Sequence, residues 1–265
     1  MKQFLAAIVL VPILALSARA QPVPATPSRT GYLSTETTPD VAKVVPPAPE
    51  TGDVRFNADM AIYRATRAIE GSPRWTMAQS DDNVSTAGIF NAFSCSLGMN
   101  LARENAPKTV ALVTRSNVDA GRAAGLLKNL YGHKRPFQVE DGNVCLSPQG
   151  KTALERSPDY PSGHTAASWE AGLILAQILP RRSTGILARA RAFGESRVVC
   201  GVHNASAVEA GWMTATAVFA AQNSSQEFQA DLKGARVELE ELLKSPPATN
   251  QACSLEVETL SYRPY

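Results

Sequence analysis

The sequence carries little net charge, and it lacks the closely spaced cysteine pairs that are typical of thiolate metal sites. Its formal net charge is +2 over 265 residues, and this falls to zero if Lys2 and Arg19 are removed with an N-terminal segment. Balanced charge argues against a general binder of nucleic acids or anionic membranes, since both need a surplus of Lys and Arg. Without any C-x-x-C pair, a zinc site built from thiolates is not expected.

Long apolar runs are also absent beyond the N-terminus. No segment after residue 20 is long, apolar and free of charge, so no transmembrane helix is expected. Before that point, Lys2 precedes an apolar run from Phe4 to Leu16, and the small-x-small pattern Ala18-Arg19-Ala20 follows. This order predicts a signal peptide that is cut after Ala20, and therefore a periplasmic or secreted protein. An uncleaved anchor is the alternative.

The cysteines number four: Cys95, Cys145, Cys200 and Cys253. An even number in an exported chain favours disulfides. Four cysteines allow three connectivities, and the sequence does not choose among them. We take Cys95–Cys145 and Cys200–Cys253 as the working pairing, with buried free thiols as the alternative.

Strand signals are few, because hardly any segment alternates apolar and polar residues, whereas apolar residues at helical spacing recur throughout the chain. The pattern predicts a single all-α domain, a helical bundle, over residues 54–245. It would follow the signal peptide at 1–20 and an extended Pro-rich arm at 21–53, with Tyr32-Leu33 and Val44-Val45 as docking points. An irregular C-terminal tail would occupy 246–265. The predicted helices span residues 54–69, 86–98, 107–131, 163–179, 184–195, 204–221 and 225–243.

Three clusters of basic and histidine residues lie between residues 128 and 207. The first has the pattern K-x6-R-P, with Lys128 near a helix end and Arg135-Pro136 in the following loop. An ammonium group and a planar guanidinium suit a tetrahedral oxyanion. A basic helix end that is merely stabilised by the helix dipole is the alternative.

The second cluster is Pro161-Ser162-Gly163-His164, at the predicted start of a helix. Free backbone N–H groups and the positive end of the helix dipole favour anions there. Gly163 permits close approach of an oxyanion, and Ser162 adds a hydroxyl donor. His164 would reach a leaving-group oxygen, unless the segment is a plain helix cap.

The third cluster is Ser196-Arg197, followed after five residues by His203. Arg197 offers a second guanidinium, and His203 lies near the start of the next helix, where it can face the same site. All three histidines of the chain, His133, His164 and His203, fall inside the stretch that holds the clusters. A single histidine at such a place more often has a structural role. The combination of the three clusters is therefore what indicates a catalytic site.

In this order and spacing, the clusters resemble the signature of the type 2 phosphatidic acid phosphatase superfamily, K-x6-R-P, P-S-G-H and S-R-x5-H-x3-D. The first two parts match fully, and the third matches through His203. With its signal peptide, its length and its lack of membrane spans, the chain is most similar to the bacterial class A non-specific acid phosphatases. The resemblance implies a helical bundle of the acid phosphatase and vanadium haloperoxidase type.

The resemblance also implies a role for each matched residue. His203 would attack phosphorus and form a phosphohistidine, and His164 would protonate the leaving alkoxide. Neither a metal nor another cofactor is needed, although phosphate or vanadate would occupy the site as inhibitors. The groups that would bind the phosphoryl oxygens belong to Lys128, Arg135, Ser162, Gly163 and Arg197.

The sequence departs from the signature at Ala207, where the family has Asp. On a helix, residue 207 would share a face with His203, and an Asp there would orient the imidazole and stabilise its charge. Ala207 can do neither. No nearby residue is an obvious substitute, since Ser206 would form only a weak bond, so we expect impaired turnover.

The leading hypothesis is an exported, metal-independent acid phosphatase that hydrolyses small phosphate monoesters with broad specificity. Two alternatives stay open: a non-catalytic member of the same fold that binds phosphate or another oxyanion, and, less favoured, a vanadate-dependent peroxidase. Neither nucleic acid nor an integral membrane is expected as a partner. A homo-oligomer is compatible with the family.

Overall fold

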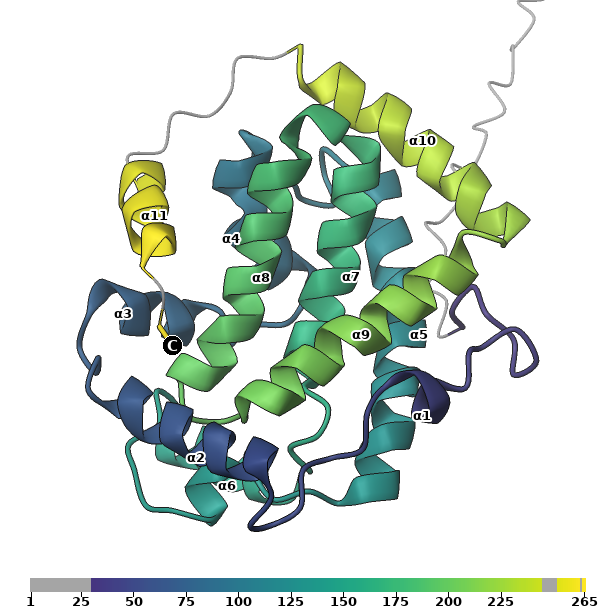
Figure 1. The fold of residues 1–265 in the computed structure, drawn as a ribbon. Helices are drawn as coiled ribbons and strands as arrows, with labels where there is room; N and C mark the ends of the chain where they lie inside the picture. Colours follow the sequence, from purple (N-terminus) through teal and green to yellow (C-terminus); the bar gives the residue numbers. More distant parts are fainter. Residues whose placement is uncertain (1–29, 245–251, 263) are drawn as a thin grey trace, which may run out of the picture.

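All regular secondary structure in the described part of the chain is helical, which confirms the all-α prediction (Figure 1). The computed structural model describes residues 30–244, 252–262 and 264–265, so the expected signal peptide and the first residues of the arm lie outside it. The helices are α1 (Val41–Val44), α2 (Val54–Arg67), α3 (Pro73–Ser80), α4 (Thr86–Leu97), α5 (Pro107–Tyr131), α6 (Pro148–Glu155), α7 (Gly163–Ile178), α8 (Ser183–Val199), α9 (Ala205–Gln222), α10 (Gln226–Leu242) and α11 (Ala252–Ser261), with short 3-10 turns η1 (Pro136–Gln138) and η2 (Pro180–Arg182).

The sequence predicted the longer helices, whereas it missed the two-turn helices α3 and α6. Both begin at a Ser-Pro pair and lie outside the helix ranges predicted from the sequence. In each case the serine caps the helix, because the Ser72 hydroxyl accepts from Trp75 N at 3.2 Å and the Ser147 hydroxyl accepts from Gly150 N at 3.2 Å. Proline is favoured directly after such a cap, since its missing N–H has no helical partner to lose.

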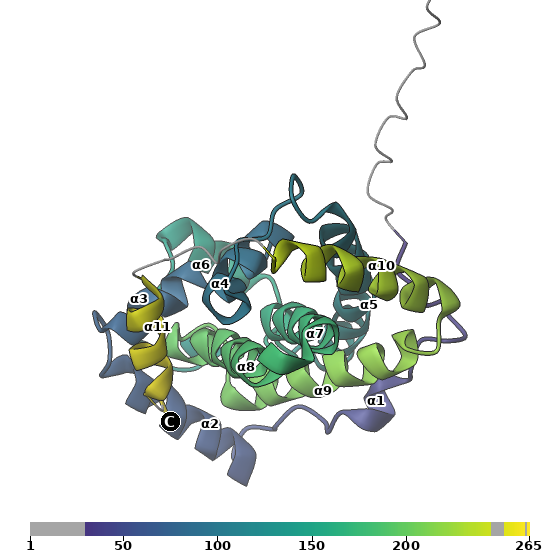
Figure 2. The same ribbon diagram turned by 90° about the horizontal axis from the view of Figure 1, so that it is seen from above.

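Helix α7 lies at the centre of the bundle and packs against α5, α8, α9 and α10 (Figure 2). Gly172 allows close packing against α8, since a Cβ at this position would lie 2.7 Å from the Cβ of Ala190. Buried residues occur on all sides of α7, as expected for a helix enclosed by others. Neither α7 nor any other helix in the described ranges is long and apolar enough to cross a membrane.

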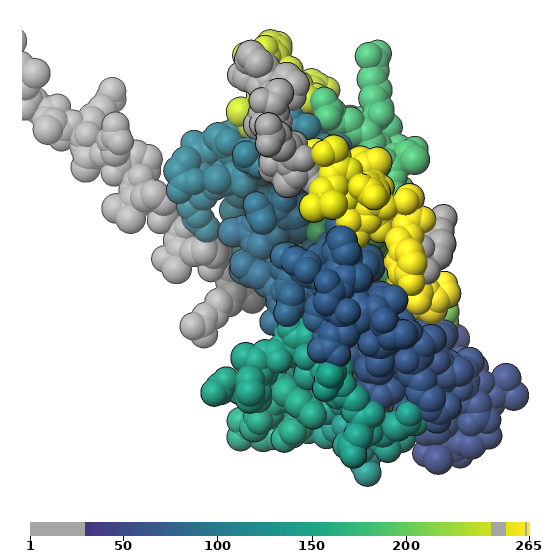
Figure 3. All heavy atoms as spheres, turned by 90° about the vertical axis from the view of Figure 1, so that its left-hand side faces the viewer, coloured from purple at the N-terminus to yellow at the C-terminus, as the bar shows by residue number. Residues whose placement is uncertain are grey.

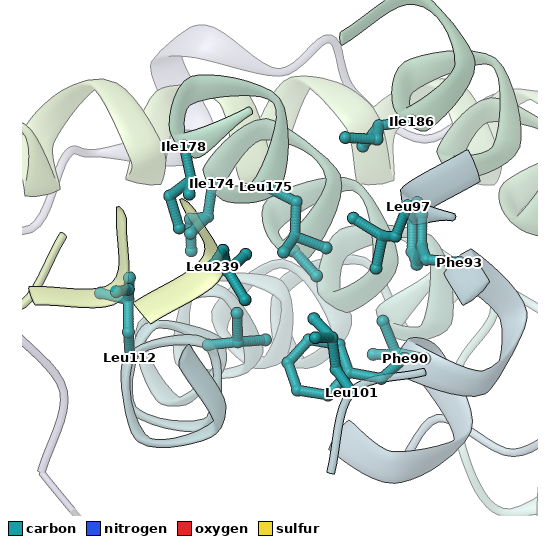
Figure 4. Close-up of a cluster of buried hydrophobic side chains, with 14 of the residues drawn as sticks. Phe90, Phe93, Leu97, Leu101, Leu112, Ile174, Leu175, Ile178, Ile186 and Leu239 are labelled. Carbon is teal, nitrogen blue, oxygen red and sulfur yellow. The ribbon is translucent and has the colours of Figure 1, made fainter. Parts of the chain in front are cut away.

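A core of aromatic and aliphatic side chains fills the end of the bundle opposite the N-terminus of α7 (Figure 4). Each large apolar side chain that is buried stabilises the fold by about 1.5–3 kcal/mol. This end of the bundle is apolar, and the polar residues of the three clusters lie at the other end. The core includes Phe90, Phe93, Leu97, Leu101, Leu112, Ile174, Leu175, Ile178, Ile186 and Leu239.

The arm before α2 is docked along the helices. The backbone N–H groups of Tyr32 and Leu33 donate to Asp119 Oδ2 at 2.7 and 3.2 Å. The Tyr32 ring packs edge-on against Phe228, with centroids 5.3 Å apart. Of the second expected docking pair, only Val45 is buried, and the short helix α1 precedes it.

The C-terminal tail is not irregular, as we had expected for residues 246–265, because residues 252–261 form α11. This helix packs against α3 and α8, and Figure 3 shows it lying across the surface as a yellow ridge over the blue segments. Its turns were missed because the segment is short and its apolar residues lack a clear helical period.

The disulfide pairing that we took from the sequence is wrong. The structure contains Cys95–Cys253 and Cys145–Cys200, with Cα–Cα distances of 5.4 and 4.7 Å. Cys145 lies beside the end of α8, where its N–H donates to the Cys200 carbonyl at 3.0 Å. Cys95 on α4 meets α11, so both pairings depend on packing between distant segments that spacing does not reveal.

Candidate active site

The three sequence clusters meet at one end of the bundle, at the bottom of Figure 1. Lys128 lies in the last turn of α5 and Arg197 in the last turn of α8. His164 lies in the first turn of α7, and His203 comes two residues before α9. Because α5 and α8 end where α7 and α9 begin, the topology gathers these side chains in one place.

Arg135 is almost fully buried, and backbone carbonyls hold most of its guanidinium. Its Nε donates to Leu154 O at 3.1 Å and to Ser157 O at 2.8 Å, while Nη1 donates to Val202 O at 2.7 Å. Nη1 also contacts Nε2 of His203 at 3.1 Å. Burial lowers the pKa of Arg135 to about 10, so the group is a fixed positive charge beside the imidazole at neutral and acidic pH.

Lys128 is partly buried, and its ammonium reaches the loop that leads into α7. Nζ donates to the carbonyl of Pro158 and, at 3.4 Å, to that of Asp159. Burial, followed by the positive charge of Arg135, lowers the pKa of Lys128 to about 8. The side chain is therefore charged at neutral and acidic pH and loses its charge in the mildly alkaline range.

The N-terminus of α7 presents free donors. Ser162 caps the helix: its Oγ accepts from Thr165 N at 3.3 Å and from Thr165 Oγ1 at 2.9 Å. Its own hydroxyl proton is used by neither contact. A Cβ built on Gly163 would meet no atom within 4 Å, so there is open space beside its Cα, at the end of the helix where backbone N–H groups favour anions.

Arg197 is the buried cation that is only partly paired. Its side chain is enclosed, yet Nε and Nη1 have no hydrogen-bond partner within the described residues. Nη2 donates to Asp82 Oδ1 at 2.9 Å. Buried guanidinium nitrogens without partners are rare, because each costs free energy, so the two free donors indicate the place of an anionic ligand.

His164 donates to a backbone carbonyl at the other side of the site. Its Nε2 lies 3.0 Å from Asp82 O, and since a carbonyl only accepts, Nε2 carries a proton. Burial and then the positive charge of Arg197 lower the pKa of His164 to about 3. A bound dianion would offset that charge and raise the pKa again.

His203 is held in one tautomer by its neighbours. An arginine has no acceptor, so the 3.1 Å contact with Arg135 Nη1 places a lone pair on Nε2 of His203. The proton is then on Nδ1, which lies 2.7 Å from Asp159 Oδ1. Burial, followed by the charge of Arg135, lowers the pKa of His203 well below its usual value, so the imidazole is neutral and the lone pair of Nε2 accepts from Arg135 Nη1.

Asp159 is the residue that our sequence reasoning missed. It is fully buried, and donors surround its carboxylate. Oδ1 accepts from His203 Nδ1, and Oδ2 accepts from His133 Nδ1 at 3.1 Å and from Asn204 Nδ2 at 2.8 Å. The available signal was an acid two residues before Pro161, directly beside the second cluster.

We expected no nearby residue to substitute for the acid that is missing at position 207, and we considered only neighbours in the sequence. Asp159 lies 44 residues from His203 and was therefore not considered. Helix α9 begins at Ala205 with Asn204 as its cap, so His203 lies outside it and the helical spacing of His203 and Ala207 does not apply. Ser206, the weak substitute that we considered, donates instead to Asp59 through its hydroxyl. It does not contact His203.

Together these groups place cations, N–H donors and two histidines at one end of the bundle. The free nitrogens of Arg197, the open N-terminus of α7 and Lys128 supply positive charge and N–H donors. His164, in the first turn of α7, and His203, two residues before α9, lie at the same end. Such a site suits transfer of a tetrahedral oxyanion, in which positioning and charge neutralisation provide most of the rate enhancement.

Comparisons with known proteins identify the family of the chain. A family model described as the PAP2 superfamily matches residues 110–228. The acid phosphatase of Zymomonas mobilis subsp. mobilis is 35% identical over 194 residues, which cover 73% of each chain. The non-specific acid phosphatase of Providencia stuartii is 34% identical over 214 residues, 80% of this chain and 86% of the relative. That of Salmonella typhi is 34% identical over 196 residues, 74% and 78% of the two chains. Relatives of this kind support a phosphatase enzyme, and the chain belongs to the PAP2 superfamily, in the group of the bacterial non-specific acid phosphatases.

Proposed function

We propose that the protein is an exported, metal-independent acid phosphatase that hydrolyses phosphate monoesters of broad specificity through a phosphohistidine on His203. The observation that supports this most directly is the orientation of His203. Its Nδ1 donates to Asp159, and its Nε2 accepts from Arg135 Nη1, a contact that an incoming phosphoryl group would displace. A neutral imidazole next to fixed cations is a competent nucleophile for a phosphoryl group.

In this proposal the cations bind the three equatorial oxygens of the phosphoryl group. Arg197 uses its free Nε and Nη1, Gly163 its backbone N–H and Ser162 its hydroxyl, while Lys128 and Arg135 add charge. His203 Nε2 forms a bond to phosphorus as the ester P–O bond breaks. His164, protonated once the bound phosphate raises its pKa, gives that proton to the leaving oxygen and becomes neutral, and water then cleaves the P–N bond to release phosphate.

Hydrolysis of p-nitrophenyl phosphate by the mature chain tests the proposal. We expect turnover that is highest in the acid range, that survives a metal chelator and that vanadate inhibits competitively. Binding of vanadate without turnover would favour the non-catalytic alternative. That alternative was motivated by Ala207, and the contact between Asp159 and His203 weakens the motivation. Oxidation of halide by peroxide in the presence of vanadate would favour the peroxidase.

Export belongs to the same proposal. The pattern from Lys2 to Ala20 predicts cleavage after Ala20 and a periplasmic or secreted mature chain. The two disulfides are typical of an oxidising compartment. The proposed partners are small phosphate monoesters, without nucleic acid or an integral membrane, and assembly into a homo-oligomer is compatible with the family.

The titration of the Lys128 ammonium is expected to set an upper pH limit for anion binding. Its pKa of about 8 means that the ammonium is charged below that pH and neutral above it. Inhibition by inorganic phosphate should therefore weaken above pH 8, by up to about tenfold per pH unit for an ammonium that binds only when charged. The inhibition constant of phosphate should be measured from pH 6.5 to 9.5 in the wild type and in Lys128→Arg.

The Lys128→Arg variant keeps its charge across that range, so it controls for the titration of phosphate itself. The ratio of the two inhibition constants should change between pH 7 and pH 9. A constant ratio would show that Lys128 does not supply the limiting charge.

Removing the negative charge of Asp82 is expected to strengthen phosphate binding, whereas loss of the positive charge of Lys128 weakens it. The Asp82 carboxylate is 44% exposed, binds Arg197 Nη2 at 2.9 Å and lies 3.7 Å from His164 Nε2. A negative charge here repels an incoming phosphate and competes for the same guanidinium. At low ionic strength Asp82→Asn should therefore lower KM by about fivefold, a gain of about 1 kcal/mol, as for a single charge pair in water.

The matched control is Asp231→Asn on α10, a comparably exposed acid whose partners are Tyr32 and Arg115. It should leave KM for p-nitrophenyl phosphate unchanged. An unchanged KM in Asp82→Asn as well would show that the carboxylate moves aside without cost when substrate binds.

A further inference from the structure

The family signature places the acid that orients the nucleophile four residues after the histidine, but this chain has no polar group there. The side chain of Ala207 is fully buried in an apolar cluster with Leu33, Leu127 and Tyr160. Its carbonyl oxygen accepts from Ser162 N at 2.8 Å. Position 207 thus helps to hold the N-terminus of α7 and offers nothing to the imidazole.

We propose that Asp159 is the positioning residue for His203 and that it takes over, from the loop before α7, the role that the family assigns to position 207. This inference rests on the proposed function, because it concerns how the nucleophile of that reaction is oriented. No group of Asp159 touches the phosphoryl transfer itself. Its effect is exerted through the Nδ1 proton of His203, 2.7 Å from Oδ1.

The surroundings of Asp159 keep it anionic and fixed. Four donor groups reach the two oxygens: His203 Nδ1 and, at 3.3 Å, Asn204 N on Oδ1, and His133 Nδ1 and Asn204 Nδ2 on Oδ2. Burial raises the pKa of Asp159, but the hydrogen bonds from His133 and His203 outweigh it and hold the pKa below its usual value. A carboxylate in this state stabilises positive charge that develops on an imidazole.

The backbone of Asp159 is tied to the same site. Its N–H donates to the carbonyl of His133 at 2.8 Å, and its own carbonyl accepts from Lys128 Nζ at 3.4 Å. The residue therefore lies between the first cluster and the second, three positions before Ser162. A carboxylate so placed can orient His203 without any help from α9.

The tautomer of His203 gives an independent check on the assignment. Arg135 can only donate, so it requires a lone pair on Nε2, and Asp159 can only accept, so it requires a proton on Nδ1. Both contacts thus favour one neutral form, with the proton on Nδ1 and the lone pair on Nε2, the nitrogen that attacks phosphorus in the proposed reaction. Without Asp159 the imidazole could rotate or exchange its proton, as happens when the acid of a serine-protease triad is replaced.

The first experiment replaces Asp159 with Asn in the mature chain. We expect kcat for p-nitrophenyl phosphate to fall by about 10³- to 10⁴-fold. The inhibition constant of inorganic phosphate should change by less than about threefold, because the cations of the site are untouched. A kcat within about tenfold of the wild type would overturn the proposal.

The matched control is Asp59→Asn. Asp59 is also buried and also binds the segment around α9, through Ser206 N and Oγ, but it does not contact His203. This variant should keep kcat within about threefold. A loss of kcat as large as that of Asp159→Asn would mean that any buried acid near α9 acts through general structure, which would also overturn the proposal.

The second measurement needs no stable variant of Asp159. The chain has three histidines, so ¹⁵N labelling of the imidazoles gives few signals, and His203→Asn identifies the one of interest. In the wild type, His203 should be neutral with its proton on Nδ1 around pH 6. A proton on Nε2 would overturn the proposal even if Asp159→Asn fails to fold. An inactive wild type with the expected tautomer would instead contradict the proposed function and leave the contact intact.

Discussion

Replacing His203 with Asn is expected to abolish turnover of p-nitrophenyl phosphate, with a loss of at least about 10⁵-fold in kcat, comparable to removal of the nucleophile from a hydrolase. The reason is chemical, because the amide nitrogen of Asn has no lone pair that can attack phosphorus. An amide at this position can still donate to Asp159, where His203 Nδ1 now donates at 2.7 Å, so the fold should be retained. Inorganic phosphate should still bind, since Arg197 and Lys128 are unchanged.

Rapid quenching with ³²P-labelled substrate separates the role of His203 from that of His164. The wild type should form an acid-labile, base-stable phosphoprotein, and His203→Asn should form none. The comparison variant is His164→Asn, which lacks only the proton donor and should still be labelled, because p-nitrophenolate leaves without protonation. Label that persists in His203→Asn and disappears in His164→Asn would exchange the two roles.

The sequence predicted the helices well wherever a long apolar period decides the structure. The 25-residue helix α5 and the central helix α7 begin and end close to where periodicity and capping residues place them. The tail was wrong because α11 depends on contacts with α3 and α8 and on the bond between Cys95 and Cys253. Short helices depend more on such contacts than on intrinsic propensity.

The site was predictable to the extent that helix ends determine it. Lys128, His164 and Arg197 lie at helix termini, so their spacing along the chain already places them together once α5, α7 and α8 pack. The partner of His203 was not predictable in this way. Asp159 lies 44 residues away, and the contact depends on the path of a loop that no periodic pattern describes.

Two buried arginines on α8 show why burial alone does not identify a functional residue. Arg189 is enclosed and fully engaged, with Nη1 and Nη2 on the two oxygens of Asp81 at 3.1 and 2.5 Å. Arg197, two turns further along, is equally enclosed but keeps Nε and Nη1 without partners. The pairing of Arg189 with Asp81 stabilises the fold. The unpaired nitrogens of Arg197 lower stability unless an anion accepts hydrogen bonds from them.

Arg197 is therefore expected to contribute to activity without contributing to stability. Arg197→Gln should lower kcat/KM for p-nitrophenyl phosphate by about 10³-fold, a loss of about 4 kcal/mol in stabilisation of the transition state. Arg197→Lys should recover only part of that loss, because one ammonium cannot replace the two free guanidinium nitrogens Nε and Nη1. The midpoint of thermal unfolding in Arg197→Gln should stay within a few degrees of the wild type or rise, since a buried charge with unpaired nitrogens has been removed.

The matched control for Arg197→Gln is Arg191→Gln, on the same helix but partly exposed and paired with Glu195. It should change neither kcat/KM nor the unfolding midpoint appreciably, because pairs of this kind contribute little. A second measurement compares the unfolding midpoints with and without saturating phosphate. Phosphate should raise the unfolding midpoint of the wild type and of Arg191→Gln by mass action, and it should raise that of Arg197→Gln far less. If phosphate stabilises Arg197→Gln as strongly as the wild type, the unpaired nitrogens of Arg197 do not bind the anion, and the oxyanion site must be centred on Arg135 and Lys128 instead.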